Sequence, residues 1–278
     1  MRKKRRIPRG LTLAFAAVST ALVIDSNFRL TTTKYTLKSA KLPKSFDGYK
    51  IALLSDLHGA WSYWDFSPVL KAVRKQSPDL IALCGDFISR PSNLPGFEFL
   101  LRKLCKIAPV YFVNGNHESR SGCINDLGDI LTSNGAVYLR DNWMNITHGG
   151  GSIILFGAED PFARLEPVDL TSLVKDVRVK NPGGYIIMLN HRNNLPELTS
   201  DLPVDAILCG HSHGGVIRLP FIAVLIRRWK NNFSPYTGGH YTFPSHDFIV
   251  SRGLGSSFPL PRLFNNPELV IIQLSSNS

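Results

Sequence analysis

Five short segments of the chain end in side chains that can bind a metal ion or transfer a proton. Each segment is a run of apolar residues, and the polar side chains follow within a few residues of its end. Carboxylates, imidazoles and an amide occur together in this arrangement, which favours a metal-dependent site. The candidates, in chain order, are Asp56, His58, Asp86, Asn116, His117, Glu118, His191, His211 and His213.

The mixture of donor atoms indicates which ions the site would take. Oxygen and nitrogen ligands of this kind suit divalent Mn, Fe, Zn or Ni better than calcium or a thiolate-bound structural zinc. The candidates are too many for one ion, whereas two divalent ions about 3.5–4 Å apart would share them across a bridging carboxylate. Such a pair activates water as a nucleophile and holds both oxygens of a phosphoryl transfer, so the set predicts phosphoester hydrolysis without a Ser or Cys nucleophile.

Each piece of the pattern also has an ordinary structural interpretation. A Gly-Asp pair is often a turn whose carboxylate caps the next helix, and a single buried imidazole such as His191 is often only hydrogen-bonded. The segment from Gly210 to Gly215 is more specific, because glycines around two imidazoles let the backbone approach a ligand closely. The joint occurrence of all five segments, each after an apolar run, favours the site.

The apolar runs read as central strands of an α/β fold. Runs of four or five apolar residues are too short for helices and fit strands that are buried on both faces, with functional side chains just past their carboxyl ends. Helices are predicted between them at 65–76, 96–107, 121–134, 168–179 and near 195–199, and 30–47 suggests an edge strand. We expect two facing mixed sheets flanked by helices, with strands at 137, 143–147, 152–157, 216–218, 240–242, 248–251 and 269–274 assigned to the second sheet.

The motifs resemble those of a known superfamily. Ser-Asp-Leu-His58, Gly-Asp86, Gly-Asn-His-Glu118, Asn-His191 and Gly-His-Ser-His213 look like the five motif blocks of the calcineurin-like metallophosphoesterases, over about residues 50–274. The block Val250-Ser-Arg-Gly-Leu-Gly255, followed by Pro267-Glu-Leu, resembles the end of the bacterial membrane-associated phosphodiesterase branch. The pyrophosphatase that cleaves UDP-2,3-diacylglucosamine in the lipid A pathway is similar to this branch. The resemblance implies a four-layer αββα fold and a binuclear metal-dependent phosphohydrolase.

The resemblance also implies a role for each motif residue. His117 would be the acid that protonates the leaving oxygen, and Glu118 would orient it. Ser212 stands where relatives commonly have Thr. One ion would be bound by Asp56, His58 and His213, the second by Asn116, His191 and His211, and Asp86 would bridge the two.

The N-terminus predicts a membrane-associated segment. Basic residues in the first ten positions supply about half of the net charge of +11, and the uncharged, mostly apolar stretch 11–24 follows them. This order is typical of a signal or an uncleaved anchor, although the stretch is short against the roughly 17–25 residues of a full span. We therefore divide the chain into an anchor at 1–28 and a catalytic domain at 29–278, held at the bacterial inner membrane, with a cleaved signal or a peripheral helix as alternatives. Basic residues on both flanks leave the side of the membrane open.

The rest of the composition limits the class of partner. Without the N-terminal cluster the chain is only mildly basic, and no basic stripe interleaved with aromatic residues predicts nucleic-acid binding. The four cysteines have no metal or disulfide spacing. The segment 219–230 joins an apolar run to Arg227 and Arg228, which predicts contact with lipid, or else a core-packed insertion. Arg252 and Arg262 are further candidates for binding the substrate phosphate.

These observations predict a membrane-attached phosphoesterase that uses two divalent ions, of Mn, Fe or Zn, to hydrolyse a phosphodiester or pyrophosphate bond. A membrane lipid or a cell-envelope precursor of the UDP-diacylglucosamine type is the expected substrate. The alternatives are a soluble-substrate phosphomonoesterase or nucleotide phosphodiesterase, and a metal-stabilised binding protein without turnover. The last would require a defect at His117 or Asp86, and both residues are present.

Overall fold

The computed structural model describes residues 9–59, 65–164, 168–194, 202–218, 234–255 and 261–276. Within these ranges the strands form two mixed sheets of six strands each. The first sheet has the order β1 (Thr31–Ser39), β12 (Glu268–Ser276), β2 (Lys50–Leu54), β3 (Leu80–Cys84), β4 (Val110–Val113) and β5 (Val137–Tyr138). The second has the order β10 (Gly239–Thr242), β11 (Asp247–Val250), β9 (Ala206–Cys209), β8 (Ile186–Leu189), β7 (Gly151–Gly157) and β6 (Asn142–His148).

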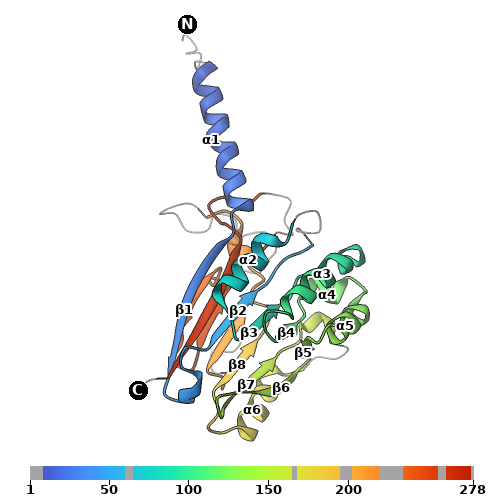
Figure 1. Ribbon diagram of the computed structural model, residues 1–278, viewed down its shortest axis with the longest axis vertical. Coiled ribbons are helices and arrows are strands. Elements are labelled where there is room, and N and C mark those ends of the chain that lie inside the picture. The colour runs from blue at the N-terminus through green and yellow to red at the C-terminus, as the bar shows by residue number, and fades with distance from the viewer. Residues whose placement is uncertain are drawn as a thin grey trace.

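The strands are continuously apolar because both of their faces are buried. In β2, Ile51 and Leu53 pack into the core between the two sheets, whereas Ala52 and Leu54 face a second core beneath helices. This alternation follows from the two-residue period of a strand. The helices of the second core are α2 (Ser67–Gln76), α3 (Leu94–Leu104) and α5 (Ile124–Ser133), and α6 (Leu170–Lys180) covers the outer face of the other sheet. The predicted four-layer arrangement of helix, sheet, sheet and helix is confirmed (Figure 1).

Short helical segments complete the described elements. They are η1 (Lys44–Phe46), η3 (Pro91–Asn93), α4 (Asn116–Arg120), η4 (Pro161–Ala163) and η5 (His213–Gly215). Two of them, α4 and η5, begin at motif residues and so bear directly on the site. The edge strand expected near residue 30 is confirmed, since β1 lies at the end of the first sheet.

Three predicted strand assignments are wrong. Both β5 and β12 belong to the first sheet, where β5 pairs with β4 and β12 pairs with both β1 and β2. Residues 216–218 form only an isolated bridge between Ile217 and Leu263, because the backbone at Val216 takes a left-handed φ of 63° that a regular strand does not allow. The predicted helix near 195–199 and the segment 219–230 lie outside the described residues.

Helix α1 (Arg9–Phe28) extends away from the body of the molecule, and the N-terminus lies at its far end (Figure 1). Its base is fixed by the segment at 262–266. The backbone N–H of Arg262 donates to Asn27 Oδ1 at 3.0 Å, and that of Phe264 donates to Ser26 Oγ at 2.9 Å. No helix in the described ranges combines the length and the sustained apolar character that crossing a bilayer requires. The anchor predicted at 1–28 is therefore not supported by the structure.

Candidate metal centre

The strands deliver the motif residues through sharp left-handed turns of the backbone. The carboxyl ends of β2, β3 and β9 are each followed by non-glycine residues with positive φ. Such conformations cost on the order of 1–3 kcal/mol each and persist where the surrounding structure enforces them, commonly at functional sites. The affected residues are Asp56 (54°), His58 (52°), Asp86 (59°), His211 (72°) and His213 (49°), all of them predicted metal ligands.

One group of ligands combines the first and the last motif. Ligand atoms of Asp56, His58 and His213 all lie within 4.8 Å of one another. His58 Nε2 is 3.0 Å from His213 Nε2, which in turn is 3.6 Å from Asp56 Oδ1. The backbone N–H of His211 donates to both carboxylate oxygens of Asp56 at 3.0 Å, which fixes this carboxylate.

A second group, formed by Asp86, His191 and His211, lies beside the first. His191 Nε2 is 3.1 Å from Asp86 Oδ2 and 3.0 Å from His211 Nδ1. The same Asp86 oxygen is 3.6 Å from His58 Nε2, a member of the first group. Asp86 Oδ2 therefore lies between the two groups, where a carboxylate could contact an ion in each of them.

Asn116 provides a separate test of whether the residues fit a cation. Its side chain is 6% exposed, and its Oδ1 has no hydrogen-bond partner in the described part of the chain. A buried acceptor without a partner costs roughly 1–3 kcal/mol. A divalent ion bound by this oxygen would remove that cost, so the unpartnered Oδ1 fits the role of metal ligand that the sequence predicts for Asn116.

Hydrogen bonds behind the imidazoles aim their inner nitrogens at the centre. His58 Nδ1 is 2.9 Å from Ser89 Oγ, and His191 Nδ1 is 2.9 Å from the Cys84 carbonyl oxygen. His213 Nδ1 is 3.3 Å from the Gly255 carbonyl oxygen. Each contact occupies the outer ring nitrogen and leaves Nε2 for a metal, as is usual in metal sites. The motif pattern did not predict these partners, since two of them are main-chain carbonyl groups.

The imidazoles of the site fall into two kinds according to the direction in which their pKa is shifted. Burial lowers the pKa of His58, His211 and His213, and neighbouring imidazoles lower it further at His58 and His211. Burial also lowers the pKa of His191, but the charge and hydrogen bond of Asp86, together with Asp56 and the Cys84 carbonyl group, outweigh it and raise the pKa of His191 to about 10. The lowered values favour neutral rings, which is the protonation state that binds metal ions.

His117 lies at the edge of both groups. Its ring centroid is 4.5 Å from that of His58, and its imidazole forms a third cluster with His58 and Asp86. It is only half-buried, unlike His58 and Asp86 beside it. An imidazole so placed can exchange a proton with a bound substrate, as its predicted role as an acid requires.

Glu118 has a different set of partners from the one that the sequence suggested. Its fully buried carboxylate accepts backbone N–H bonds from Asp86 (2.8 Å), Phe87 (2.5 Å), Ile88 (2.9 Å) and Gly115 (2.8 Å). These bonds tie the turn after β3 to the turn after β4. Burial, reinforced by the charge of Asp86, raises the pKa of Glu118 to about 7 although the hydrogen bonds oppose this. Within the described residues no hydrogen bond joins Glu118 to the His117 ring.

The turns after β3 and β4 also pack too closely for a side chain. A Cβ atom on Gly115 would lie 2.7 Å from the backbone nitrogen of Asp86. Only glycine allows this approach, which brings Asn116 and His117 beside Asp86.

The arginines predicted to bind phosphate have partners within the chain. Arg252 Nη2 donates to Glu268 Oε1 at 2.8 Å and to Thr31 Oγ1 at 3.1 Å. Arg262 is buried and donates from Nε to the Gly255 carbonyl oxygen at 3.1 Å. Their role toward substrate stays a prediction, and Arg227 and Arg228 lie outside the described residues.

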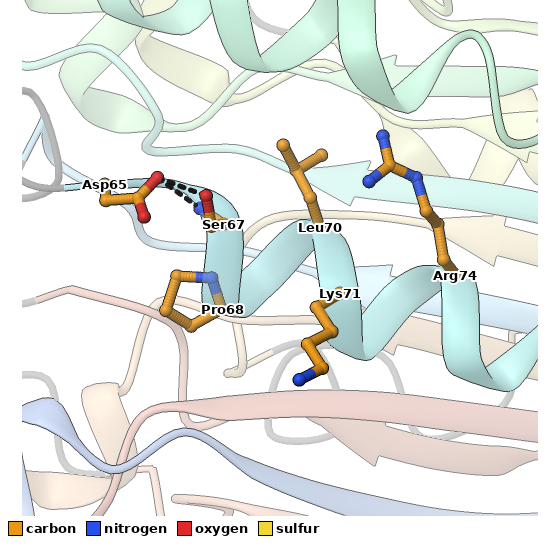
Figure 2. A pocket seen from close by; sticks show the side chains of 6 residues that line it. All are labelled: Asp65, Ser67, Pro68, Leu70, Lys71 and Arg74. Atoms are coloured by element: carbon orange, nitrogen blue, oxygen red, sulfur yellow. Dashed lines mark hydrogen bonds between the residues drawn. The ribbon is translucent and has the colours of Figure 1, made fainter.

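A cavity of about 630 Å³ lies along α2, and Figure 2 shows the residues that line it. Asp65 accepts from the backbone N–H of Ser67 at 2.9 Å, one residue before Phe66, which occupies the N-cap position of this helix. None of the lining residues is a metal-ligand candidate, so this cavity is separate from the site. They are Asp65, Ser67, Pro68, Leu70, Lys71 and Arg74.

Comparison with known proteins agrees with this geometry. The sequence profile described as calcineurin-like phosphoesterase matches residues 49–215. The metallophosphoesterase YkuE of Bacillus subtilis is 29% identical over 252 residues, which are 89% of this chain and 86% of that protein. The phosphodiesterase YaeI of Escherichia coli is 29% identical over 241 residues, covering 81% of this chain and 82% of YaeI. The crystal structure of TT1561 from Thermus thermophilus shares the fold, with a TM-score of 0.50 at 12% identity over 75% of this chain and 89% of that one.

Proposed function

Because the chain belongs to the calcineurin-like phosphoesterase family and is therefore a metal-dependent hydrolase, we propose that it hydrolyses a phosphodiester or pyrophosphate bond. The observation that carries this proposal is the position of Asp86 Oδ2, which lies 3.6 Å from His58 Nε2 and 3.1 Å from His191 Nε2. A carboxylate between two groups of ligands suits a pair of ions rather than one. The likeness to a phosphodiesterase of Escherichia coli supports the choice of a diester.

The donor set suits two divalent cations of Mn, Fe or Zn. When bound, such a pair lowers the pKa of water towards neutrality and offsets charge on the phosphoryl oxygens. Asn116 would give its unpartnered Oδ1 to the second ion. The remaining ligands are Asp56, His58 and His213 in the first group, His191 and His211 in the second, and Asp86 between them.

His117 supplies the proton for the leaving oxygen. Its backbone N–H donates to Asp86 Oδ1 at 2.8 Å, so the start of α4 is tied to the bridging carboxylate. The ring is thereby kept beside His58 while one side remains accessible. General-acid help of this kind contributes about 10²–10⁴-fold to the rate.

The choice between diester and monoester is tested with bis-p-nitrophenyl phosphate against p-nitrophenyl phosphate. With Mn²⁺ present, we expect kcat/KM for the diester to exceed that for the monoester by about tenfold or more, a difference of about 1.4 kcal/mol in transition-state binding. EDTA should abolish both activities, and added Mn²⁺ should restore them. A preference for the monoester would contradict the proposal and favour the phosphomonoesterase alternative.

We also propose that residues 1–28 hold the enzyme at an anionic membrane, where its substrate is a lipid or an envelope precursor such as a UDP-diacylglucosamine. Leu13, Phe15 and Val18 are exposed on α1, and the basic cluster lies at the same end of the chain. An apolar helix with neighbouring cations binds to the interface of a bilayer with anionic lipids. Figure 1 shows that α1 extends away from the sheets, which leaves these side chains accessible.

Membrane attachment is tested by sedimentation of the full chain with vesicles that contain phosphatidylglycerol. Phe15→Glu should weaken binding by about tenfold or more. The change removes apolar area that would be buried in the bilayer interface, and it places a negative charge at an anionic surface. Val179→Glu is the matched control, because Val179 is equally exposed but lies on α6. Equal binding by the two variants would contradict the proposal.

A further inference from the structure

Two arginines meet on one aromatic ring next to the metal centre. Phe162, in η4, is 55% exposed. The guanidinium carbon of Arg120 lies 4.3 Å from the centre of its ring, and that of Arg192 lies 4.9 Å from it. Contact with a ring face holds a guanidinium group in place while leaving its N–H groups free to donate. We refer to Arg120, Phe162 and Arg192 as the arginine platform.

The platform is attached to the elements that carry the ligands. Arg192 directly follows His191, a ligand of the second group. Arg120 ends α4, the helix that begins with Asn116 and His117. Residues three apart on a helix are neighbours, with Cβ atoms about 5–6 Å apart, so Arg120 lies next to the imidazole assigned as the acid. The platform therefore borders the side of the site where the leaving group must be.

The platform is fixed in place by a buried carboxylate. Asp160 has no exposed side-chain surface and accepts from Arg192 Nε at 2.7 Å and from Arg192 Nη2 at 3.3 Å. It also accepts from the backbone N–H of Phe162 at 3.0 Å, and its own N–H donates to Asn114 Oδ1. Asp160 thus neutralises Arg192 and positions the ring of Phe162 at the same time.

Arg120 keeps its charge available. Its side chain is exposed, and among the described residues it contacts the Phe162 ring and pairs with no carboxylate. A cation that is held by a ring, has no counter-ion and lies beside a phosphoester site is suited to an anionic part of the substrate.

We propose that Arg120 binds a phosphate on the leaving-group side of the scissile bond, so that the preferred substrate is a pyrophosphate. This inference rests on the proposed function and selects one of its two bond types. In the reaction, a water oxygen forms a bond to one phosphorus while the bond from that phosphorus to the bridging oxygen breaks. The bridging oxygen leaves with the second phosphate and takes the proton of His117. Negative charge on that phosphate grows as the bond breaks, so Arg120 stabilises the transition state more than the bound substrate.

The test compares Arg120→Gln with the wild-type full chain, both loaded with Mn²⁺, on two substrates. UDP-N-acetylglucosamine has a leaving group that carries a phosphate, and bis-p-nitrophenyl phosphate has one that does not. We expect kcat/KM for the pyrophosphate to fall by about tenfold to a hundredfold, as is usual for the loss of a charged hydrogen bond. The loss on the diester should be clearly smaller, because its leaving group carries no phosphate for Arg120 to bind. Arg120→Lys should recover part of the loss.

Lys103→Gln is the matched control. Lys103 also places its charge over an exposed aromatic ring, 5.4 Å from the centre of Phe99, but lies on α3. It should affect neither substrate. Equal losses on both substrates, or no loss with Arg120→Gln, would overturn the inference. A wild-type protein that cleaves the diester but not the pyrophosphate would overturn it while leaving the proposed function intact, whereas a metal-loaded protein inactive on both would contradict the proposed function itself.

Discussion

Asp86→Ala is expected to lose bound metal and about a thousandfold or more of its activity on bis-p-nitrophenyl phosphate. The carboxylate lies between the two groups of ligands, so its removal weakens both ion sites at once. The ions contribute several kcal/mol of transition-state stabilisation, which corresponds to a factor of this size. Metal content by elemental analysis and steady-state kinetics would measure the two effects.

Two further variants separate metal binding from folding. Asp86→Asn keeps an oxygen that can accept the bond from the His117 backbone, so it should remain folded by circular dichroism and still lose the bridging charge. Asp126→Ala removes an exposed carboxylate on α5 and should change nothing. An Asp86→Asn protein that retained two metal equivalents and wild-type turnover would refute the bridging assignment.

His117→Ala should have the opposite combination of effects, with metal retained and turnover lost. The ring touches the edge of both groups, but each group has its own ligands without it. We expect kcat to fall by about 10²–10⁴-fold on an alkyl phosphodiester, whose leaving oxygen needs a proton. The loss should be smaller with p-nitrophenol as the leaving group, because a weakly basic oxygen needs less help.

The control for His117 is His148→Ala. His148 is exposed at the end of β6, and its ring contacts Phe46 and Tyr49 rather than the metal centre. It should keep full activity on both esters. Wild-type turnover of an alkyl diester by His117→Ala would show that another group donates the proton.

The convergence of the candidate metal ligands could be predicted because strand geometry controls where they lie. Parallel strands such as β2 and β3 end at the same edge of a sheet, so Asp56 and Asp86 meet once both runs are recognised as strands. The opposite sheet brings His191 and His211 to the same centre in the same way. The order of the strands was harder to predict. The pattern of β12 shows that both of its faces are buried, but it contains nothing that selects β1 and β2 as partners over the second sheet.

Contacts between loops could not be predicted from the sequence either. The position of Glu118 in α4 indicates a functional carboxylate, yet whether it turns to the His117 ring or to backbone N–H groups depends on how the turn after β3 folds against it. The arginine platform was missed because Arg120, Phe162 and Arg192 come from three separate segments without a shared period. The adjacency of Arg192 to His191 was the one available signal.

The pairing of β12 has a consequence for how the chain folds as it is synthesised. This strand lies between β1 and β2, parallel to the former and antiparallel to the latter. Residues 268–276 must therefore leave the ribosome before the earliest strands of the molecule can be joined into one sheet. Helix α1 emerges long before that, while the first sheet is still incomplete. Assembly of the sheet that carries Asp56 and Asp86 therefore depends on pairing between segments that lie far apart in the sequence, and such pairings form slowly.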